Sequence, residues 1–337
     1  MKPYCILPWT NLYLSPIGYG IECPVFFKEN EHALSHTIEE VYNSDYLKQI
    51  RKNCIRQDVH EACAKCVNFK KDSSQITMLN KLIKKGGRVG ENAQTVLDSY
   101  LESKYDINIY PIFISFEVSY KCNIKCIYCD LKTEPFNYDT TLINSVFKIT
   151  DLLAELHLTG GEPFVNKEVI DFVLNKPNEP QALSFTTNGT KLKNYIPSLL
   201  AFKNLSIYIS LDTINKKVLE YERLGVNYDH LMDSIQQLIS CKQNKHDFSI
   251  GFSVCITKSN ITQLNELIDW SVANNIDIIQ FCYLNGDHED LDIMKNPKLI
   301  PISEWSFLKK LKKSLHTKQI QFIDKEPLIN FINSYEK

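Results

Sequence analysis

Lys121-Cys122-Asn123-Ile124-Lys125-Cys126-Ile127-Tyr128-Cys129 is the stretch of sequence that decides the fold. Its three cysteines have C-x3-C-x2-C spacing and follow Ile112 to Val118, a segment in which apolar and polar residues alternate as in a strand. Three thiolates can hold a cubane iron–sulfur cluster by three of its irons and leave the fourth iron open for a ligand. Zinc usually takes four closed ligands, so the spacing favours an open iron–sulfur cluster.

The composition is that of a globular protein with more than one domain. The chain has 337 residues, of which 44% are hydrophobic and 23% are charged, which favours one large α/β unit and a smaller appendage. No segment has the order of residues found in a secretory signal or the length of a transmembrane span. Its eleven cysteines therefore indicate metal binding in the cytoplasm rather than disulfides. The formal charge of -2 gives no sign of nucleic-acid binding, and we expect no membrane partner.

From about Pro111 onward, strand-like and helix-like segments alternate, as is typical of a parallel sheet built from βα units. Six strands are expected, at Ile112 to Val118, Glu155 to Thr159, Ala182 to Thr186, Leu205 to Leu211, Phe248 to Ile256 and Ile276 to Leu284. In most of them apolar residues alternate with polar ones, although parallel strands are ordinarily apolar on both faces. If the apolar face packs against helices, the polar face lines a barrel lumen that binds ligands.

A second motif, Thr159-Gly160-Gly161-Glu162-Pro163, stands at the carboxyl end of the second expected strand, where α/β folds place ligands. Together with the cysteine run it resembles the radical S-adenosylmethionine (radical SAM) superfamily. The resemblance implies a partial (β/α)6 barrel with a 4Fe-4S cluster on Cys122, Cys126 and Cys129, whose open iron chelates the methionine part of S-adenosylmethionine. One electron, from a donor such as flavodoxin or ferredoxin, then cleaves this cofactor to methionine and a 5'-deoxyadenosyl radical, which abstracts a substrate hydrogen atom.

The resemblance also implies contacts with S-adenosylmethionine. Glu162 would accept hydrogen bonds from its ammonium group, Arg223 would pair with its carboxylate, and Tyr128 would lie beside its adenine. From the residues alone, an exposed helical arginine and an aromatic shield for the cluster remain open alternatives. The predicted cofactor-binding residues are Tyr128, Gly160, Gly161, Glu162, Pro163, Asn188, Ser210, Asp212 and Arg223.

The N-terminal region holds a second group of cysteines, namely Cys5, Cys23, Cys63 and Cys66. A hairpin formed by Asn11 to Leu14 and Ile21 to Phe26 would bring Cys5 toward Cys23, and four thiolates suit zinc or a 4Fe-4S cluster equally well. The pattern resembles the twitch or SPASM auxiliary-cluster module of radical SAM enzymes, which implies one auxiliary 4Fe-4S cluster, although that module follows the barrel in the best-known members. Cys54 has no obvious pair and is interpreted as a free thiol.

These motifs predict four regions. Residues 1–75 form the auxiliary-cluster domain, residues 76–110 a helical linker, residues 111–290 the radical SAM partial barrel and residues 291–337 a C-terminal helical cap. The amphipathic spacing of Leu308, Leu311 and Leu315 predicts a helix in the cap.

The function expected is that of a radical SAM oxidoreductase that oxidises or dehydrogenates a small polar, sugar-like molecule or a peptide. The alternatives are a radical SAM epimerase or peptide-modifying maturase and, ranked lower, a non-catalytic metal-cluster protein. Strand alternation aims Cys255 at the lumen, where its thiol would return a hydrogen atom to a substrate radical if the enzyme is an epimerase. A packed structural cysteine is the plainer interpretation of the same residue.

Overall fold

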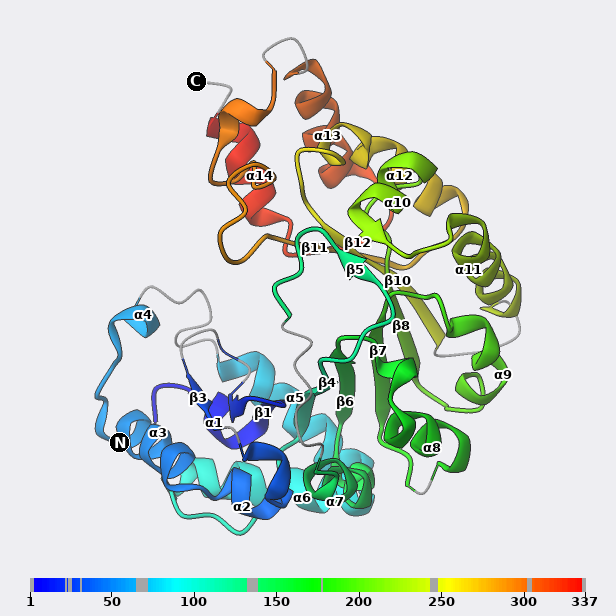
Figure 1. Cartoon of the computed structure of the whole chain (residues 1–337). Helices are drawn as coiled ribbons and strands as arrows, with labels where there is room; N and C mark the ends of the chain where they lie inside the picture. Colours follow the sequence, from blue (N-terminus) through cyan, green and yellow to red (C-terminus); the bar gives the residue numbers. More distant parts are fainter. Residues whose placement is uncertain are drawn as a thin grey trace. The chain divides into compact units, whose positions relative to one another are not determined.

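The computed structural model describes residues 3–21, 23, 26–30, 32–64, 72–131, 139–176, 178–242, 248–301 and 305–334. The described chain is α/β, and most of its strands alternate with helices (Figure 1). It divides into two compact units, of which the first comprises Met1–Lys121 and Thr133–Ser184 and the second comprises Cys122–Lys132 and Phe185–Lys337. The C-x3-C-x2-C run therefore lies in the second unit, whereas the N-terminal cysteines lie in the first.

The sheet of the first unit has the strand order β3-β2-β1-β4-β6. Its strands are β1 (Asn11–Ser15), β2 (Gly18–Gly20), β3 (Phe27–Glu29), β4 (Phe113–Ser119) and β6 (Glu155–Gly160). β4 pairs in parallel with both β1 and β6, and Phe116 is the register partner of Leu14 on one side and of Leu158 on the other. The pairs β1–β2 and β2–β3 are antiparallel. The N-terminal hairpin is thus an extension of the sheet that contains the first predicted barrel strand.

Helices of the first unit pack around a core of buried aromatic rings. They are α1 (Leu7–Thr10), α2 (Ile38–Tyr42), α3 (Asp45–Arg56), α4 (Glu61–Ala64), α5 (Asp72–Lys85), α6 (Gly87–Leu101), α7 (Thr141–Lys148) and α8 (Lys167–Asn175). Thr37 and Glu40 form a capping box that begins α2. The fully buried Arg51 on α3 donates from Nε to the Pro8 carbonyl at 2.9 Å and from Nη2 to the Tyr42 carbonyl at 3.0 Å. These bonds fix α1 and α2 to α3.

The sheet of the second unit has the order β8-β10-β11-β12, with all of these neighbours parallel. Its strands are β8 (Leu205–Ser210), β10 (Phe248–Cys255), β11 (Ile278–Cys282) and β12 (Gln321–Ile323). A separate two-stranded ribbon joins β5 (Lys125–Cys126) to β9 (Arg223–Leu224), with Cys126 opposite Arg223. The strand β7 (Ala182–Thr187) contains the division between the units.

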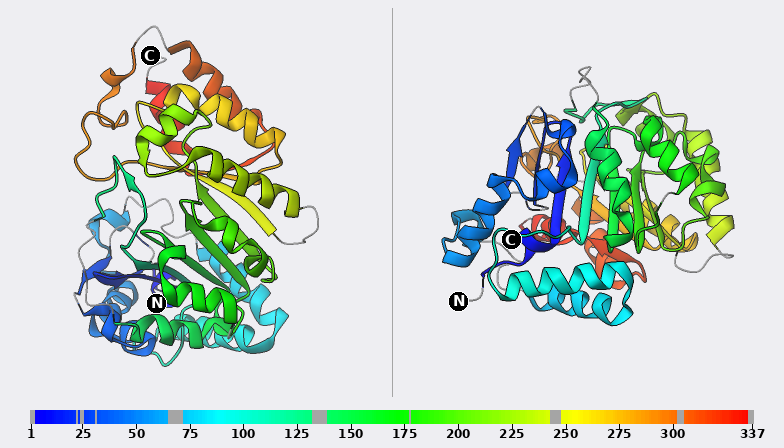
Figure 2. Two further views of the ribbon diagram at one scale, coloured as in Figure 1. Left: turned by 45° about the vertical axis from the view of Figure 1, so that its right-hand side comes forward. Right: turned by 90° about the horizontal axis from the view of Figure 1, so that it is seen from below.

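Helices lie along the strands of the second unit in both views of Figure 2. They are α9 (Ile196–Leu199), α10 (Lys216–Glu222), α11 (Tyr228–Lys242), α12 (Leu264–Ala273), α13 (Trp305–Thr317) and α14 (Glu326–Ser334). Leu231, Ile235 and Leu238 form the buried side of α11, as a helical period of 3.6 residues requires. Among the residues that the structure describes, no helix is both long enough and apolar enough to cross a membrane.

Burial alternates along the strands of the second unit. On β8, Leu205, Ile207 and Ile209 are fully buried, whereas Tyr208 and Ser210 are only partly buried. The parallel register places Ser210 beside Ser253, and Ser253 beside Gln280 on the next strand. Because register partners on neighbouring strands point to the same face, this unit has one apolar face and one polar face.

The predicted fold class, α/β with a partial (β/α)6 barrel, is confirmed. Each of the six predicted strands is present, with ends that differ from the prediction by at most two residues. The predicted position of the second hairpin strand, Ile21 to Phe26, is wrong, because β2 begins at Gly18 directly after a tight turn. The C-terminal cap contains the predicted helix together with β12, which joins the sheet. The boundaries of the four predicted regions stay a prediction, and the division between the two compact units lies within the predicted barrel.

Candidate active site

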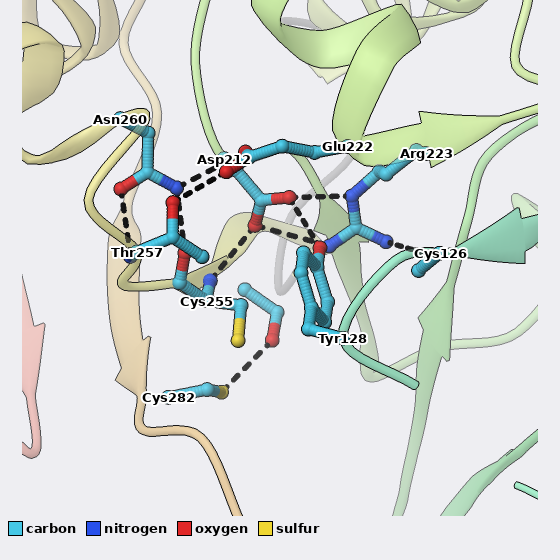
Figure 3. Close-up of polar contacts among 10 residues, drawn as sticks. Cys126, Tyr128, Asp212, Glu222, Arg223, Cys255, Thr257, Asn260 and Cys282 are labelled. Atoms are coloured by element: carbon cyan, nitrogen blue, oxygen red, sulfur yellow. Dashed lines mark hydrogen bonds and ion pairs between the residues drawn. The ribbon is translucent and has the colours of Figure 1, made fainter. Parts of the chain in front are cut away.

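A buried ion pair lies at the centre of the polar contacts in the second unit (Figure 3). Arg223 donates from Nε to Oδ2 of Asp212 at 2.6 Å and from Nη2 to Oδ1 at 3.0 Å. Asp212 comes two residues after the end of β8, and Arg223 begins β9. Asp212 has no exposed surface and Arg223 is 7% exposed. Water does not solvate these buried groups, so the two hydrogen bonds between them let the charge of each group neutralise that of the other.

This ion pair is tied directly to the cysteine run. The hydroxyl of Tyr128 donates to Oδ2 of Asp212 at 2.5 Å, and its ring centroid lies 5.6 Å from the guanidinium carbon of Arg223. The remaining nitrogen of that guanidinium, Nη1, donates to Sγ of Cys126 at 3.6 Å. The loop that carries two of the predicted cluster ligands is thus positioned by Asp212 and Arg223.

A second carboxyl group lies beside the ion pair. Glu222 is fully buried, and its carboxyl accepts hydrogen bonds from the hydroxyl of Thr257 and, at 3.3 Å, from Nδ2 of Asn260. Burial, together with the negative charge of Asp212, raises the pKa of Glu222 to about 7. Glu222 is therefore a group that changes its charge near neutral pH next to a charged pair.

Two further thiols end neighbouring strands on the same polar face. Cys255 is the last residue of β10 and Cys282 the last residue of β11, and the two are register partners. The backbone N–H of Cys255 donates to Oδ1 of Asp212 at 2.8 Å. The hydroxyl of Ser253 lies 3.3 Å from Sγ of Cys282. The strand ends thus add two sulfur atoms to the surroundings of the ion pair.

The cysteine run has the hydrogen-bond donors that an iron–sulfur site needs. Besides the Arg223 bond to Cys126, Nδ2 of Asn188 donates to Sγ of Cys122 at 3.7 Å. Donors of this kind stabilise cluster thiolates and tune their potential. Burial raises the pKa of Cys126 to about 11, so bound iron has to displace its proton. Across the described ranges, no three His, Cys, Asp or Glu side chains are grouped to hold a single metal ion. Two of the three cysteines thus have donors of the kind that an iron–sulfur site uses, and the cluster on Cys122, Cys126 and Cys129 stays a prediction.

The glycine motif of the first unit is a tight turn. Gly160 has a φ of +120°, and a Cβ there would lie 2.4 Å from the carbonyl oxygen of Ser119; at Gly161 it would lie 2.2 Å from that of Lys121. Both positions therefore require glycine. Glu162 is fully buried, its N–H donates to the Lys121 carbonyl at 2.8 Å, and its Oε1 accepts from the Phe164 N–H at 3.1 Å. The turn thus packs against the residue that precedes the cysteine run.

The predicted contacts with S-adenosylmethionine are placed as follows. The fork of Arg223, predicted for the methionine carboxylate, lies on Asp212, and Tyr128 bonds to the same carboxylate. Asn188 bonds to Cys122 and, at 3.1 Å, to Asn123. Ser210 lies on the polar face, and Pro163 begins a short 3-10 helix, Pro163–Val165. The structure thus brings Asn188, Asp212 and Arg223 to the cysteine run, which itself contains Tyr128, and the cofactor roles of these residues stay predictions.

The N-terminal cysteines have an arrangement that the sequence did not predict. Cys54 and Cys63 both lie near the hydroxyl of Tyr4, and burial, with added effects of these two thiols, raises the pKa of Tyr4. Cys54 is a buried cysteine that forms no disulfide, in agreement with its interpretation from the sequence, and it lies near the Tyr4 hydroxyl. Cys23 lies near enough to Tyr46 to raise the pKa of that hydroxyl further, after burial and Tyr19. Cys66 lies outside the described residues, and the auxiliary cluster stays a prediction.

Sequence reasoning missed Glu222, Thr257, Asn260 and Cys282. Glu222 and Asn260 are 38 residues apart, and their contact forms only when the turn after β10 meets the end of α10. A signal for Cys282 did exist, because it stands two residues after Gln280 and thus on the same face of the strand.

These features define a class of site: a loop of thiolates, positioned by a buried ion pair, at the carboxyl ends of parallel strands. It is the arrangement of an iron–sulfur enzyme in an α/β barrel. Residues 116–271 match the family model of the Radical SAM superfamily. This segment of the chain belongs to that superfamily, and the predicted 4Fe-4S cluster and S-adenosylmethionine are the cofactors that it uses.

Curated relatives share this segment. The chain is 26% identical over 198 residues to the GTP 3',8-cyclase of Peptoclostridium acidaminophilum, a match that covers 56% of this chain and 58% of the cyclase. It is 33% identical over 118 residues to the subtilosin biosynthesis protein AlbA of Bacillus subtilis, covering 32% of this chain and 26% of AlbA. With the mycofactocin maturase MftC of Mycolicibacterium smegmatis the identity is 25% over 162 residues, covering 46% and 40%. The chain thus spans at most a little over half the length of these relatives.

Among solved structures, Streptococcus suis SuiB bound to S-adenosylmethionine aligns with a TM-score of 0.49 at 15% identity, covering 95% of this chain and 71% of SuiB. The enzyme anSMEcpe with bound AdoMet aligns with a TM-score of 0.45 at 18% identity, covering 62% of each chain.

Proposed function

We propose that this protein is a radical SAM enzyme that abstracts a hydrogen atom from an unactivated carbon of a peptide. The observation that carries the proposal is the contact chain from Cys126 through Arg223 and Asp212 to Tyr128 and Cys255. This chain of contacts links the thiolates that would hold the cluster to the polar face of β10. When bound, the cluster and S-adenosylmethionine supply a carbon-centred radical.

The protein's own residues position the reactants and limit the loss of that radical. Asp212 and Arg223 are buried, so the loop with Cys126 and Cys129 is held by a pair that water does not reach. Arg223 also carries a positive charge next to a sulfur atom that becomes negative when it binds iron. Tyr208, Ser210, Ser253 and Gln280 on the polar face orient the substrate, and Glu222 adjusts the local charge near neutral pH.

A peptide is the favoured substrate because two of the aligned relatives are a bacteriocin biosynthesis protein and a maturase. The match to AlbA has the highest identity of the three relatives described above. A polar strand face with hydroxyl and amide groups suits the backbone of an extended peptide.

A small polar molecule is the second candidate. Of the three curated relatives described above, the GTP 3',8-cyclase aligns with the largest share of this chain, 56%. GTP is therefore the probe that separates the two candidates. If GTP increases the rate at which S-adenosylmethionine is cleaved and is itself consumed, the small-molecule substrate replaces the peptide.

The N-terminal cysteines are proposed to hold an auxiliary 4Fe-4S cluster on Cys5, Cys23, Cys63 and Cys66. A closed cluster would accept the electron of a substrate radical and make the net reaction an oxidation. Replacement of Cys63 by serine would then stop product formation while cleavage of S-adenosylmethionine continues. Unchanged turnover in that variant would remove the electron-acceptor role.

The proposed function is tested by the cleavage of S-adenosylmethionine. The whole chain is reconstituted with iron and sulfide under anaerobic conditions and reduced, and 5'-deoxyadenosine is measured by mass spectrometry. We expect multiple equivalents from the natural chain and from the control Cys241→Ala, and a loss of at least about 100-fold in Cys126→Ala, since a missing thiolate disrupts the open-iron site. A chain that binds iron but forms no 5'-deoxyadenosine would be a non-catalytic metal-cluster protein.

A further inference from the structure

Cys255 and Cys282 occupy equivalent positions on neighbouring parallel strands. They are the final residues of β10 and β11 and form the last register pair between these strands. Register partners point to the same face of a sheet, and Figure 3 shows both side chains reaching into the space beside Tyr128 and Asp212. The two thiols therefore form a pair, and Cys255 is not a single isolated cysteine.

The backbone geometry allows these two residues to form a disulfide. Neighbouring strands are about 4.8 Å apart in a sheet, and disulfides need a Cα separation of roughly 4.4–6.8 Å. Both residues are partly buried cysteines in the reduced state. The register pairing thus gives the two residues a backbone separation within the range that disulfides use.

The surroundings keep both groups as thiols rather than thiolates. Burial, followed by the negative charge of Asp212, raises the pKa of Cys255, and burial raises the pKa of Cys282. The Ser253 hydroxyl lies within hydrogen-bond distance of Cys282, and the N–H of Cys255 is fixed on Asp212. A protonated thiol is a poor nucleophile but keeps the S–H bond that hydrogen-atom donation requires.

We propose that Cys255 and Cys282 are a dithiol that donates a hydrogen atom to carbon radicals formed in this site and then closes to a disulfide. The inference rests on the proposed function, because that function supplies the carbon radical. Cys255 is assigned as the donor, since its backbone bonds to Asp212, which in turn bonds to Tyr128 of the cysteine run. Cys282 is assigned as the partner that forms the disulfide.

Cys255 donates the hydrogen atom first, and the disulfide forms afterwards. The S–H bond of Cys255 breaks, its hydrogen atom forms a C–H bond on the radical, and a thiyl radical remains on Cys255. The S–S bond forms with Cys282, which releases one proton and one electron. Oxidised flavodoxin, the electron carrier used with this chain, accepts this electron, and an external dithiol reduces the disulfide before the next turnover. The substrate carbon regains a hydrogen atom, so the net change in the substrate is an inversion of configuration. A radical that takes this route is not oxidised by the auxiliary cluster proposed above, so the two routes exclude each other for a given radical.

The experiment needs no substrate, because the 5'-deoxyadenosyl radical is itself a carbon radical formed in this site. The whole reconstituted chain is incubated with S-adenosylmethionine and reduced flavodoxin in D2O, in which thiol hydrogens exchange with solvent. The deuterium content of the 5'-deoxyadenosine is measured by mass spectrometry. Peptide mapping of the alkylated protein then measures the Cys255–Cys282 disulfide.

For the natural chain and for Cys241→Ala we expect one deuterium in most of the 5'-deoxyadenosine and a disulfide that accumulates with it. Cys255→Ser is expected to lose at least about three quarters of the label, because an O–H bond is too strong to donate, and Cys282→Ala to keep the label without the disulfide. The label is counted per 5'-deoxyadenosine formed, so the labelled fraction can be compared even if a variant cleaves S-adenosylmethionine more slowly. Equal labelling in Cys255→Ser, or no disulfide in the natural chain, would overturn the dithiol. Absence of 5'-deoxyadenosine from the natural chain would instead contradict the proposed function and remove the basis of this inference.

Discussion

The two units differ in how their buried polar side chains are stabilised. In the first unit, the Ser184 hydroxyl donates to Glu155 at 2.8 Å and lies 2.7 Å from Nδ1 of His157. Burial lowers the pKa of His157 to about 4, so the ring is neutral at physiological pH. In the second unit, Asp212 and Arg223 stay charged because each neutralises the other. Hydrogen bonding to a neutral ring is therefore sufficient in one unit, whereas the other unit needs a charge pair.

This difference concerns the charge beside the predicted cluster ligands. A cluster with thiolate ligands would be anionic, and Arg223 places a cation 3.6 Å from the sulfur atom of Cys126. The contacts described for His157, Ser184 and Glu155 in the first unit include no comparable cation. The four predictions below test this contrast, in order of decreasing effect.

The largest effect is expected from loss of the buried charge pair. Asp212→Ala leaves Arg223 buried without its counter-charge, which should lower the free energy of unfolding by about 3–5 kcal/mol. Urea denaturation at pH 7.5 measures this change. The matched control is Asp229→Ala, because the ion pair of Asp229 with Lys216 is exposed, and little change is expected there. If the two substitutions lower the free energy of unfolding equally, burial does not determine how much an ion pair contributes to stability.

The second prediction concerns alkaline pH. The folded-state pKa of Glu222, about 7, lies above the ordinary value of 4.5, so the stability that the neutral carboxyl contributes at pH 4.5 is lost as the pH rises through 7. Glu222→Gln keeps a neutral group of the same shape. Between pH 5 and pH 9 the stability of the variant relative to the natural chain should rise by about 3 kcal/mol. Parallel denaturation curves across this range would contradict the assignment.

The third prediction concerns the first unit, where stability is lost as the pH falls and not as it rises. The folded-state pKa of His157, about 4, lies below the ordinary value of 6.5, so its contribution to stability is complete above pH 6.5 and is lost as the pH falls toward 4. His157→Gln should remove this acid sensitivity, which amounts to roughly 2 kcal/mol after allowance for the partial exposure of the ring. Thermal unfolding of both proteins at pH 7 and pH 4.5 measures it. If the variant is as acid-sensitive as the natural chain, another group is responsible.

The smallest effect is expected from Ser184→Ala. The substitution removes the hydroxyl that joins Glu155 to His157, and a neutral hydrogen bond of this kind contributes about 1 kcal/mol. Denaturation at pH 7 should show a loss of this size, with cleavage of S-adenosylmethionine retained. If Ser184→Ala lowers the free energy of unfolding as much as Asp212→Ala does, the buried charge pair is no more important to stability than the hydrogen bonds of the first unit.

Local patterns were enough to predict the strands and to select the cysteines that are proposed as cluster ligands. The alternation in Leu205 to Leu211 and the spacing of Cys122, Cys126 and Cys129 depend on residues that are near in sequence, so they can be found without the fold. The pairing of β1 with β4 could not be predicted, because it joins residues about one hundred positions apart and a parallel pairing leaves no turn signal.

The ion pair and the dithiol escaped prediction for the same reason. Asp212 was expected to contact the cofactor, and its pairing with Arg223 depends on how β9 meets β5. The partnership of Cys255 with Cys282 depends on the register between two strands, which the order of residues in either strand does not specify. Sequence reasoning therefore selected several residues that the structure brings together, but not the ion pair and the hydrogen bonds between them.

The most direct test of the central claim is electron paramagnetic resonance of the reduced, reconstituted chain with and without S-adenosylmethionine. If Cys122, Cys126 and Cys129 hold a cluster with an open iron, addition of S-adenosylmethionine should shift the g values of the reduced cluster. The shift should persist in Cys63→Ser and disappear in Cys126→Ala. A spectrum that S-adenosylmethionine leaves unchanged, or a shift that persists in Cys126→Ala, would contradict the account.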